Sequence, residues 1–329
     1  MEALGWDPDE QPNRFLSGYG HQLVELYARL RLGGYSVSIG RSVVGSRPAV
    51  VASLEELAKW TPRIQEIPAI GLALASTRAS SVAVIRGDLP LAIELPGYVA
   101  REFMPTKAAV TNPSRQVSLP LLPQRGLLSR DPGRGTRVEV IVLKAYSHNV
   151  EPWLQEARFI GRLSSMGLQL RTDTEVDQPN RWSDFRDVDV ALCRHRFPVW
   201  DHDALRKPAT KLANAWCAGA IPIVSSHRSY LEFGRPEVDV LVADDSEEVI
   251  TQLLRLRDPG LVRRLQDAGA EAAKRFDRRV LLEEWWTALT SMPPSRRGPA
   301  FRSLITLGSP YVAKRFARQL RKRFSSECP

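Results

Sequence analysis

The second half of the chain alternates short apolar runs with longer segments of helical periodicity. Each apolar run is bounded by turn residues and predicts a buried strand; these runs are 137–144, 168–172, 188–194, 221–225 and 238–243. Apolar residues three or four positions apart predict helices over 150–167, 208–218, 246–256 and 258–289, with a short one near 230. Strands that alternate with helices favour an α/β fold with a parallel, doubly wound sheet.

The first half has a less regular pattern and predicts a smaller α/β domain. Its segments favour a helix, a Gly-Gly stop and a strand over 18–40, a short helix over 53–60, and strands at 81–87, 98–103 and 107–112. Pro, Gly and Arg dominate 119–135, which is the best candidate for a connection. We therefore expect two Rossmann-like domains, over 1–135 and 136–292, and a separate tail over 293–329.

Size and composition fit a soluble protein of two domains. The chain has 329 residues, of which 43% are hydrophobic and 25% charged. No apolar run approaches the roughly 18 residues that cross a bilayer, and the acidic N-terminus does not match a secretory signal. Three scattered cysteines show neither metal-ligand spacing nor a disulfide framework. The expected location is therefore the reducing cytoplasm.

The net charge is +9, and 38 of the 46 basic residues are arginine. Arginine richness reflects either genome composition or phosphate recognition, because the guanidinium fork matches phosphate oxygens. The position of the charge decides between these two explanations.

Positive charge gathers where the helix predicted over 208–218 begins. Pro208 suits a first helical position, and helix N-termini at the carboxyl ends of parallel strands favour anions. Lys207, Lys211 and Asn214 are spaced four and three apart, so they share one stripe. Two lysines there oppose the helix dipole unless an anion such as a pyrophosphate binds. The alternative is a solvated charged face on a packing helix.

The turn after the next strand carries more polar groups. Tyr230 and Glu232 lie there, and a carboxylate in such a place could accept hydrogen bonds from ribose or sugar hydroxyls. Lys144 and Arg194 each end a predicted strand, so either could contact phosphate at the same edge.

The stretch KPATKLANAWCAGAIPIVSSHRSYLEFG combines a basic turn, a helix, Ala-Gly before a Pro-bearing strand, and a Tyr/Glu turn. With this rhythm, 137–289 resembles the C-terminal nucleotide-sugar-binding domain of GT-B fold glycosyltransferases. It is similar to the retaining branch, where Asn214 replaces a Glu, and to the fucosyltransferase-like branch, where Thr210-Lys211 stands for an EK pair. The resemblance implies two domains facing a cleft, a diphosphate contact at Lys211, and donor contacts at Asn214, Tyr230 and Glu232.

The first half looks like a GT-B acceptor domain. SGYGHQLVELYARLRLGGYSVSIG resembles its Gly-rich turn, first helix and second strand, with His21 at the turn. Asp88 follows the strand predicted at 81–87, so it should face the cleft. Either residue could be the catalytic base or contact the acceptor. A capping or surface histidine and a turn aspartate are the alternatives.

No metal site is expected. The triplets Asp187-Val-Asp189 and Asp201-His-Asp203 match the DxD pattern of GT-A glycosyltransferases, but such triplets arise easily by chance. Lys207, Lys211 and the helix N-terminus would themselves supply positive charge to a departing diphosphate. We therefore expect no cofactor besides the nucleotide-sugar donor.

Residues 311–324 predict a basic amphipathic C-terminal helix. Apolar residues recur every fourth position, from Val312 to Phe324, with six basic residues and no acid between them. Such a helix is expected to lie on an anionic membrane surface. Packing against the first domain is the alternative; nucleic-acid binding has no supporting motif.

These features predict a cytoplasmic, membrane-peripheral, metal-independent glycosyltransferase. It would move a hexosyl or deoxyhexosyl group from a nucleoside-diphosphate sugar to a hydroxyl of a glycan or lipid-linked acceptor, in bacterial cell-envelope or polysaccharide synthesis. The alternatives are an epimerase or hydrolase that acts on the same donor, and a non-catalytic nucleotide-sugar-binding protein.

Overall fold

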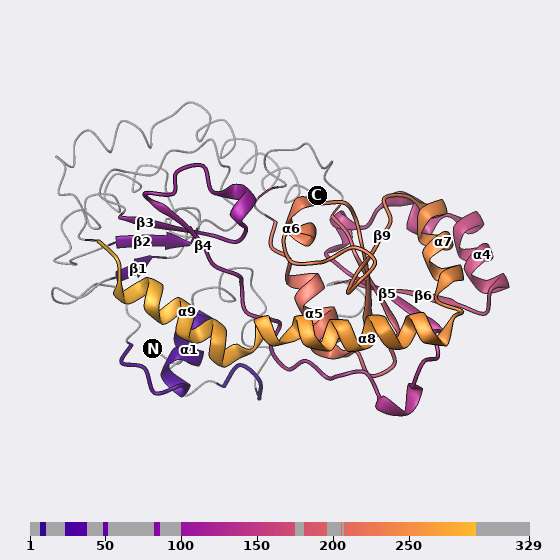
Figure 1. The fold of residues 1–329 in the computed structure, drawn as a ribbon, viewed down its shortest axis with the longest axis horizontal. Helices are drawn as coiled ribbons and strands as arrows, with labels where there is room; N and C mark the ends of the chain where they lie inside the picture. The colour runs from indigo at the N-terminus through magenta and orange to yellow at the C-terminus, as the bar shows by residue number, and fades with distance from the viewer. Residues whose placement is uncertain are drawn as a thin grey trace, which may run out of the picture. The chain divides into compact units, whose positions relative to one another are not determined.

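The computed structural model describes residues 7–10, 24–37, 49–51, 82–85, 100–174, 181–195, 205 and 207–293 (Figure 1). The chain forms two compact units: 1–39 joins 104–288 in the first, and 40–103 joins 289–329 in the second. The domain boundaries expected at 135 and 292 stay predictions.

The first unit holds a five-stranded sheet in which every neighbouring pair is parallel. Its strands are β5 (Val140–Lys144), β6 (Gln169–Asp173), β7 (Val190–Cys193), β8 (Ile221–Val224) and β9 (Leu241–Val242). They lie in the order β6-β5-β7-β8-β9. The associated helices are α4 (Ala157–Ser165), α5 (Thr210–Ala218), α6 (Arg228–Leu231), α7 (Ser246–Arg255), α8 (Pro259–Ala273) and α9 (Arg278–Thr290). The predicted α/β class is confirmed by this sheet and its helices.

Successive side chains of each strand point to opposite faces of the sheet, and both faces are buried. Ile141 and Leu143 of β5 point into a core that α4, α7 and part of α8 cover. Val142, between them, joins the opposite core with α5, where Trp216 is almost fully buried. Trp216 packs against Gly269 of α8, where an added Cβ would meet the indole at 3.0 Å. The continuous apolar strands of the sequence reflect this two-sided burial.

Two glycines end helices as their positions in the sequence predict. Gly219 follows α5 with a left-handed φ of +77°, and the next residue, Ala220, donates its N–H to the carbonyl of Ala215 (2.9 Å). Gly167 follows α4 with a φ of +75°. Glycine adopts this conformation without a Cβ penalty. The turn at Gly219 leads directly into β8.

A smaller sheet has the order β1-β2-β3-β4. Its strands are β1 (Ala49–Val51), β2 (Val82–Ile85), β3 (Arg101–Met104) and β4 (Gln116–Ser118), and the first three are parallel neighbours. Helix α1 (Glu25–Leu32) ends before Gly33-Gly34, as predicted, with Gly34 at a φ of +83°. This second sheet, with three parallel strands, extends the α/β class to the first half of the chain.

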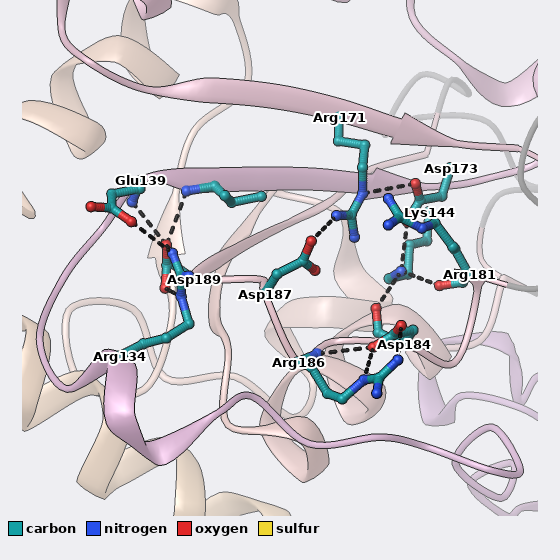
Figure 2. A network of polar contacts seen from close by, with 11 residues as sticks. Arg134, Glu139, Lys144, Arg171, Asp173, Arg181, Asp184, Arg186, Asp187 and Asp189 are labelled. Carbon is teal, nitrogen blue, oxygen red and sulfur yellow. Dashed lines mark hydrogen bonds and ion pairs between the residues drawn. The ribbon is translucent and has the colours of Figure 1, made fainter.

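Asp189 anchors the amino edge of the larger sheet. The carboxylate is almost fully buried and accepts hydrogen bonds from Arg130 (2.8 and 3.0 Å) and Arg134 (2.7 and 2.8 Å). It also accepts the backbone N–H groups of Glu139 and Val140, at 2.8 and 2.9 Å (Figure 2). Burial would raise the pKa of Asp189, but these partners, Arg134 foremost, hold it below its ordinary value. One side chain thus joins the start of β7 to the start of β5 and to the connection before it.

A second buried ion network fixes α1 within the first unit. Arg29 pairs with Asp9 (2.9 Å) and Glu25 (2.8 Å), and Glu25 also pairs with Arg125 (3.2 Å). Asp9 in turn accepts from Arg278 of α9 at 2.7 Å. Helices from both ends of the described chain are therefore tied to the segment around residue 125.

Several predicted elements are wrong in type or extent. Residues 107–109 form a 3₁₀ helix, η5 (Lys107–Ala109), instead of a strand, because the Thr106 hydroxyl accepts the N–H of Ala109 (3.2 Å). The single helix predicted over 258–289 is two helices separated by η11 (Lys274–Phe276) and Asp277, which is extended and accepts the N–H of Arg279 (2.8 Å). Extended Glu156 likewise separates η8 (Pro152–Gln155) from α4. The remaining 3₁₀ helices are η6 (Pro132–Arg134) and η7 (Ser147–Asn149).

Asp189→Asn should destabilise the fold by about 3–5 kcal/mol, because it leaves two guanidinium groups without their buried counter-charge. Because folding lowers the pKa of Asp189, its ion pairs stabilise the folded state above about pH 4. This stabilisation is lost as the pH falls through the pKa of Asp189 in the folded protein. The measurement is urea unfolding at pH 7 and at lower pH.

Glu247→Gln is the matched control. Glu247 pairs with Arg162, but both side chains are exposed, so its loss should cost no more than about 1 kcal/mol. Equal effects of the two substitutions would contradict the anchoring role of Asp189.

Candidate functional site at the carboxyl edge of the larger sheet

The strand order places a topological switch point between β5 and β7. β5 is followed in sequence by β6 on one side, and the chain then returns to β7 on the other side. Ligands of doubly wound sheets bind beyond the carboxyl ends of the strands near such a point. The residues that follow β5, β7 and β8 therefore define the candidate site.

Helix α5 begins at this edge without a side-chain cap. Ala209 occupies the N-cap position and accepts no hydrogen bond through its side chain, whereas Asp245 and Asp258 cap α7 and α8. Uncapped N–H groups at a helix start favour an anionic partner. The helix begins at Thr210, so Pro208 is not its first residue. Lys207 lies before the helix and therefore, contrary to the prediction from the sequence, does not share a helical stripe with Lys211 and Asn214.

Lys211 is the basic side chain set most directly into this edge. Its Nζ donates to the carbonyl of Arg194, at 2.5 Å, just beyond the end of β7. Burial lowers the pKa of the Lys211 ammonium to about 8, and the neighbouring charges of Lys207 and Arg194 act in the same direction. An anion at this position would stabilise the charged form.

Two histidines and a tyrosine lie beside Lys211. His195 follows β7, and its ring stacks on Tyr230 of α6 with centroids 4.8 Å apart and planes 1° apart. His227, which caps α6, meets the ring of His195 edge-on at 4.9 Å. We call His195, Lys211, Ser225, His227 and Tyr230 the edge cluster.

The tautomer of His227 follows from its contacts. The N–H of Ser229 donates to Nδ1 of His227 at 3.2 Å, and the Ser229 hydroxyl lies 2.7 Å from the same nitrogen. Nδ1 is therefore an acceptor, which assigns the proton of the neutral ring to Nε2.

The cluster contains buried polar atoms without a hydrogen-bond partner among the described residues. These atoms are Nε2 of His195, Oγ of Ser225 and the hydroxyl of Tyr230. Tyr230 is fully buried, and Ser225 is 6% exposed. Because buried polar atoms are nearly always paired, this set indicates a missing polar partner.

Lys144, predicted to contact phosphate, is hydrogen-bonded within the chain instead. Its Nζ donates to the Asp173 carboxylate (2.7 Å), to the carbonyl of Asp184 (3.0 Å) and to the carbonyl of Arg181 (Figure 2). An ammonium has three N–H donors, so these acceptors use all of them. The geometry favours a structural role at the ends of β5 and β6.

Arg194 also has its partners inside the chain. Its guanidinium pairs with Glu151 and donates to the carbonyls of Ala243 (2.5 Å) and Asp244 (2.6 Å). These contacts join the carboxyl ends of β7 and β9. The Arg194 side chain therefore stabilises the carboxyl edge of the sheet, and its backbone carbonyl accepts the hydrogen bond from Lys211.

Asn214 and Glu232 face other parts of the first unit. The Asn214 amide exchanges two hydrogen bonds with Gln124, at 2.8 and 3.2 Å. The Glu232 carboxylate accepts the N–H groups of Lys107 (2.8 Å) and Ala108 (3.3 Å) at the start of η5. Donor contacts by either residue stay predictions.

An aromatic group lies beyond the end of β5. Tyr146 packs edge-on against Trp182, with centroids 4.9 Å apart, and stacks near His148 at 5.7 Å. Tyr146 is 37% exposed, so part of its ring is open to a ligand. Exposed aromatic faces stack readily on nucleobases.

Several predicted site residues lie outside the described residues. These are His21, Asp88 and the amphipathic segment 311–324. Asp201 and Asp203, the DxD triplet that was set aside as a chance match, also lie outside the described residues. Of the other DxD triplet, Asp187 pairs with Arg171 at 2.5 Å, and Asp189 is the anchor described above. Both of these carboxylates are thus occupied by guanidinium groups. Within the described ranges, no helix has the length and apolar character needed to span a bilayer.

Lys207, Lys211 and Tyr230 were proposed for this edge from the sequence, whereas His195, Ser225 and His227 were not. The missed residues stand one to three positions beyond β7 or β8, where parallel strands place side chains at one edge. Their position after the strands was the available signal.

No protein-family model matches the sequence, and no curated protein sequence matches it. Solved structures similar to the chain include glycosyltransferases, as the resemblance in the sequence led us to expect. HepE from Anabaena, solved with UDP and glucose, is 13% identical, with a TM-score of 0.48 over 74% of this chain and 78% of that one. AviGT4, a glycosyltransferase of avilamycin A biosynthesis, is 16% identical, with a TM-score of 0.43 over 85% and 90%. An α1,3-fucosyltransferase with GDP is 11% identical, with a TM-score of 0.40 over 83% and 98%.

Two partly buried lysines should respond oppositely to replacement by methionine. Lys211→Met should stabilise the ligand-free protein at pH 7.5 by roughly 1–3 kcal/mol, because the wild type pays to bury this charge. An unfolded lysine holds its proton up to about pH 10.4, so wild-type stability should rise between pH 8 and 10. Urea unfolding across this range should show the gap between the two proteins closing.

Lys144→Met is the contrasting variant. It should destabilise by about 3–5 kcal/mol, because fully buried Asp173 loses one of its two ion-pair partners and keeps only Arg171. The carbonyls of Arg181 and Asp184 also lose the donor that Lys144 supplies. A loss of stability in Lys211→Met as large as that in Lys144→Met would show that Lys211 is structural.

Proposed function

We propose that the protein is a glycosyltransferase that moves a sugar from a nucleoside-diphosphate donor to a hydroxyl acceptor. The observation that carries the proposal is Lys211, held at the uncapped start of α5 beside unpaired buried polar atoms at the carboxyl edge. A diphosphate would supply both the negative charge and the hydrogen-bonding oxygens that this arrangement favours.

Lys211 would act on the leaving group. As the bond between the anomeric carbon and the diphosphate breaks, negative charge develops on the departing oxygen. A preorganised ammonium and the N–H groups at the start of α5 stabilise that charge with little reorganisation. Lys207 adds a second positive charge near the same turn. In this mechanism the protein itself neutralises the leaving group, so we propose that no metal is required.

The aromatic group after β5 supports a donor with a planar base. Tyr146 and Trp182 follow β5 and β6, whereas Lys211 faces the end of β7. Neighbouring strands lie about 4.8 Å apart, so these groups can meet different ends of one nucleotide. The nucleoside would stack on the aromatic group while the diphosphate lies toward α5.

The acceptor side of the proposal rests on the sequence. His21 or Asp88 would deprotonate or orient the acceptor hydroxyl. The basic segment 311–324 would hold the protein at an anionic membrane, where a lipid-linked acceptor in cell-envelope glycan synthesis would be available.

Thermal unfolding with a panel of UDP, GDP, ADP, dTDP and CMP tests the donor site. One diphosphate should raise the wild-type midpoint, since a ligand at about 100 times its Kd adds about 2.7 kcal/mol. The same nucleotide should shift Lys211→Ala far less, because its main charge contact is gone.

Lys274→Ala serves as the control, since Lys274 is an exposed lysine paired with Glu271 on the surface. It should respond to nucleotides like the wild type. If no nucleotide shifts well-folded wild-type protein, the proposed function is wrong.

Deleting 311–324 tests the membrane arm of the proposal. The full chain should sediment with vesicles rich in phosphatidylserine, less so at high salt, and the truncated chain should stay in the supernatant. Equal sedimentation of both would exclude this segment as the membrane contact.

A further inference from the structure

His195 combines a buried, unpaired nitrogen with surroundings that repel a proton. Its Nε2 has no hydrogen-bond partner within the described residues, and its ring lies flat against Tyr230. Burial lowers the pKa of His195 well below its ordinary value, and Lys211, His227 and Lys207 lower it further. The ring is therefore neutral when the edge cluster is empty.

The groups that face His195 come from every element packed around it. Lys207 precedes α5 and Lys211 lies in its first turn. His227 caps α6 and Tyr230 belongs to it, and Cys193 and Arg194 precede His195 in the sequence. Burial keeps the Cys193 thiol and the Tyr230 hydroxyl protonated, because it raises the pKa of each above its ordinary value. The Arg194 guanidinium is paired with Glu151. The field at His195 is thus positive.

An anion would reverse this field. Ser225 follows β8, and β8 is the direct neighbour of β7, with Val224 opposite Cys193. The unpaired atoms of His195, Ser225 and Tyr230 therefore lie beyond adjacent strands, beside Lys211. Phosphate oxygens placed there would accept hydrogen bonds from these groups, and their negative charge would offset that of the lysines.

We propose that His195 is an anion-binding residue of this site, and that its ring takes up one proton from solvent when the phosphate groups of a ligand bind. The inference rests on the proposed donor site. It adds His195 to the residues that bind the diphosphate, and it adds the uptake of one proton by the His195 ring on binding. A neutral imidazole has one N–H, whereas the imidazolium has two. Uptake thus turns both ring nitrogens into donors, and the proton returns to solvent when the anion leaves.

The pH dependence separates His195 from Lys211. Binding an anion favours the protonated form of the protein groups beside it. The phosphate groups of the ligand also ionise at about pH 6, but that ionisation is the same for the wild type and for a variant. The wild type should therefore lose affinity relative to a variant without His195 as the pH rises. Lys211 contributes near pH 8, where its ammonium loses a proton in the empty protein. At pH 6.5 Lys211 is charged with or without ligand, so proton uptake beyond that of the ligand itself belongs to a protein group with a lower pKa, which is His195 in this proposal.

Isothermal titration calorimetry with inorganic pyrophosphate at pH 6.5 tests the proposal on the full chain. Titrations in two buffers of different ionisation enthalpy give the number of protons taken up. On binding pyrophosphate, the wild type should take up about half a proton or more in excess of the number taken up by His195→Gln. The affinity of the wild type should increase from pH 8 to pH 6, and the variant should lose most of that increase. His148→Gln, an exposed histidine outside the edge cluster, should match the wild type.

Each result of these experiments either supports or overturns the proposed role of His195. Equal proton uptake by the wild type and His195→Gln, with binding intact, overturns the role of His195 and leaves the donor site standing. No binding of pyrophosphate by folded wild type overturns both. If His195→Gln does not fold, His195→Asn and the ring ¹⁵N shifts of the wild type replace it. A histidine that changes from neutral to charged on adding pyrophosphate supports the proposal, and five unchanged histidines overturn it.

Discussion

The carboxylate of Asp189 fixes the geometry on which the larger sheet depends. It accepts from two arginines of the connection and from two backbone N–H groups at the start of β5, while itself standing at the start of β7. The β5–β7 pair is where the strand order reverses. A fixed register at the amino end of this pair determines which residues emerge at the carboxyl end. The candidate site is thus positioned by an ion network at the opposite edge of the sheet.

Features decided by local sequence were predicted well. The apolar strands β5 to β8 bury both faces, and Gly219 occupies the left-handed position that ends α5. Features decided by single capping contacts were not. Thr106 converts a strand-like KAAVTN into a 3₁₀ turn, and Asp277 divides a continuous helical pattern in two. Such a contact changes the backbone over only one or two residues. A hydrophobic pattern is read over a whole segment, so it does not reveal so local a change.

The chemistry of the site was harder to predict than its location. Lys144 and Arg194 were proposed because each ends a strand, and Lys211 because it lies at the start of a helix, but position alone does not say what each side chain meets. Lys144 meets Asp173, and Arg194 meets Glu151, 29 and 43 residues away in sequence. These partners come from other strand ends or from loops, so only the folded chain shows that two of the three cations are already neutralised. Lys211, in contrast, has a carbonyl and not a carboxylate as its hydrogen-bond partner.

That contrast divides the carboxyl edge into two parts. Beyond β5 and β6, the carboxylates of Asp173 and Asp187 balance Lys144 and Arg171, so this part needs no further charge. Beyond β7 and β8, the Lys211 ammonium donates to a carbonyl and to no described carboxylate, and three buried polar atoms lack partners among the described residues. Burial of uncompensated charge costs stability, and natural folds keep such an arrangement where a ligand compensates it. Under the proposed function, the diphosphate of the donor would lie beside α5 and α6, and the nucleoside would lie on the balanced side, beside the exposed ring of Tyr146.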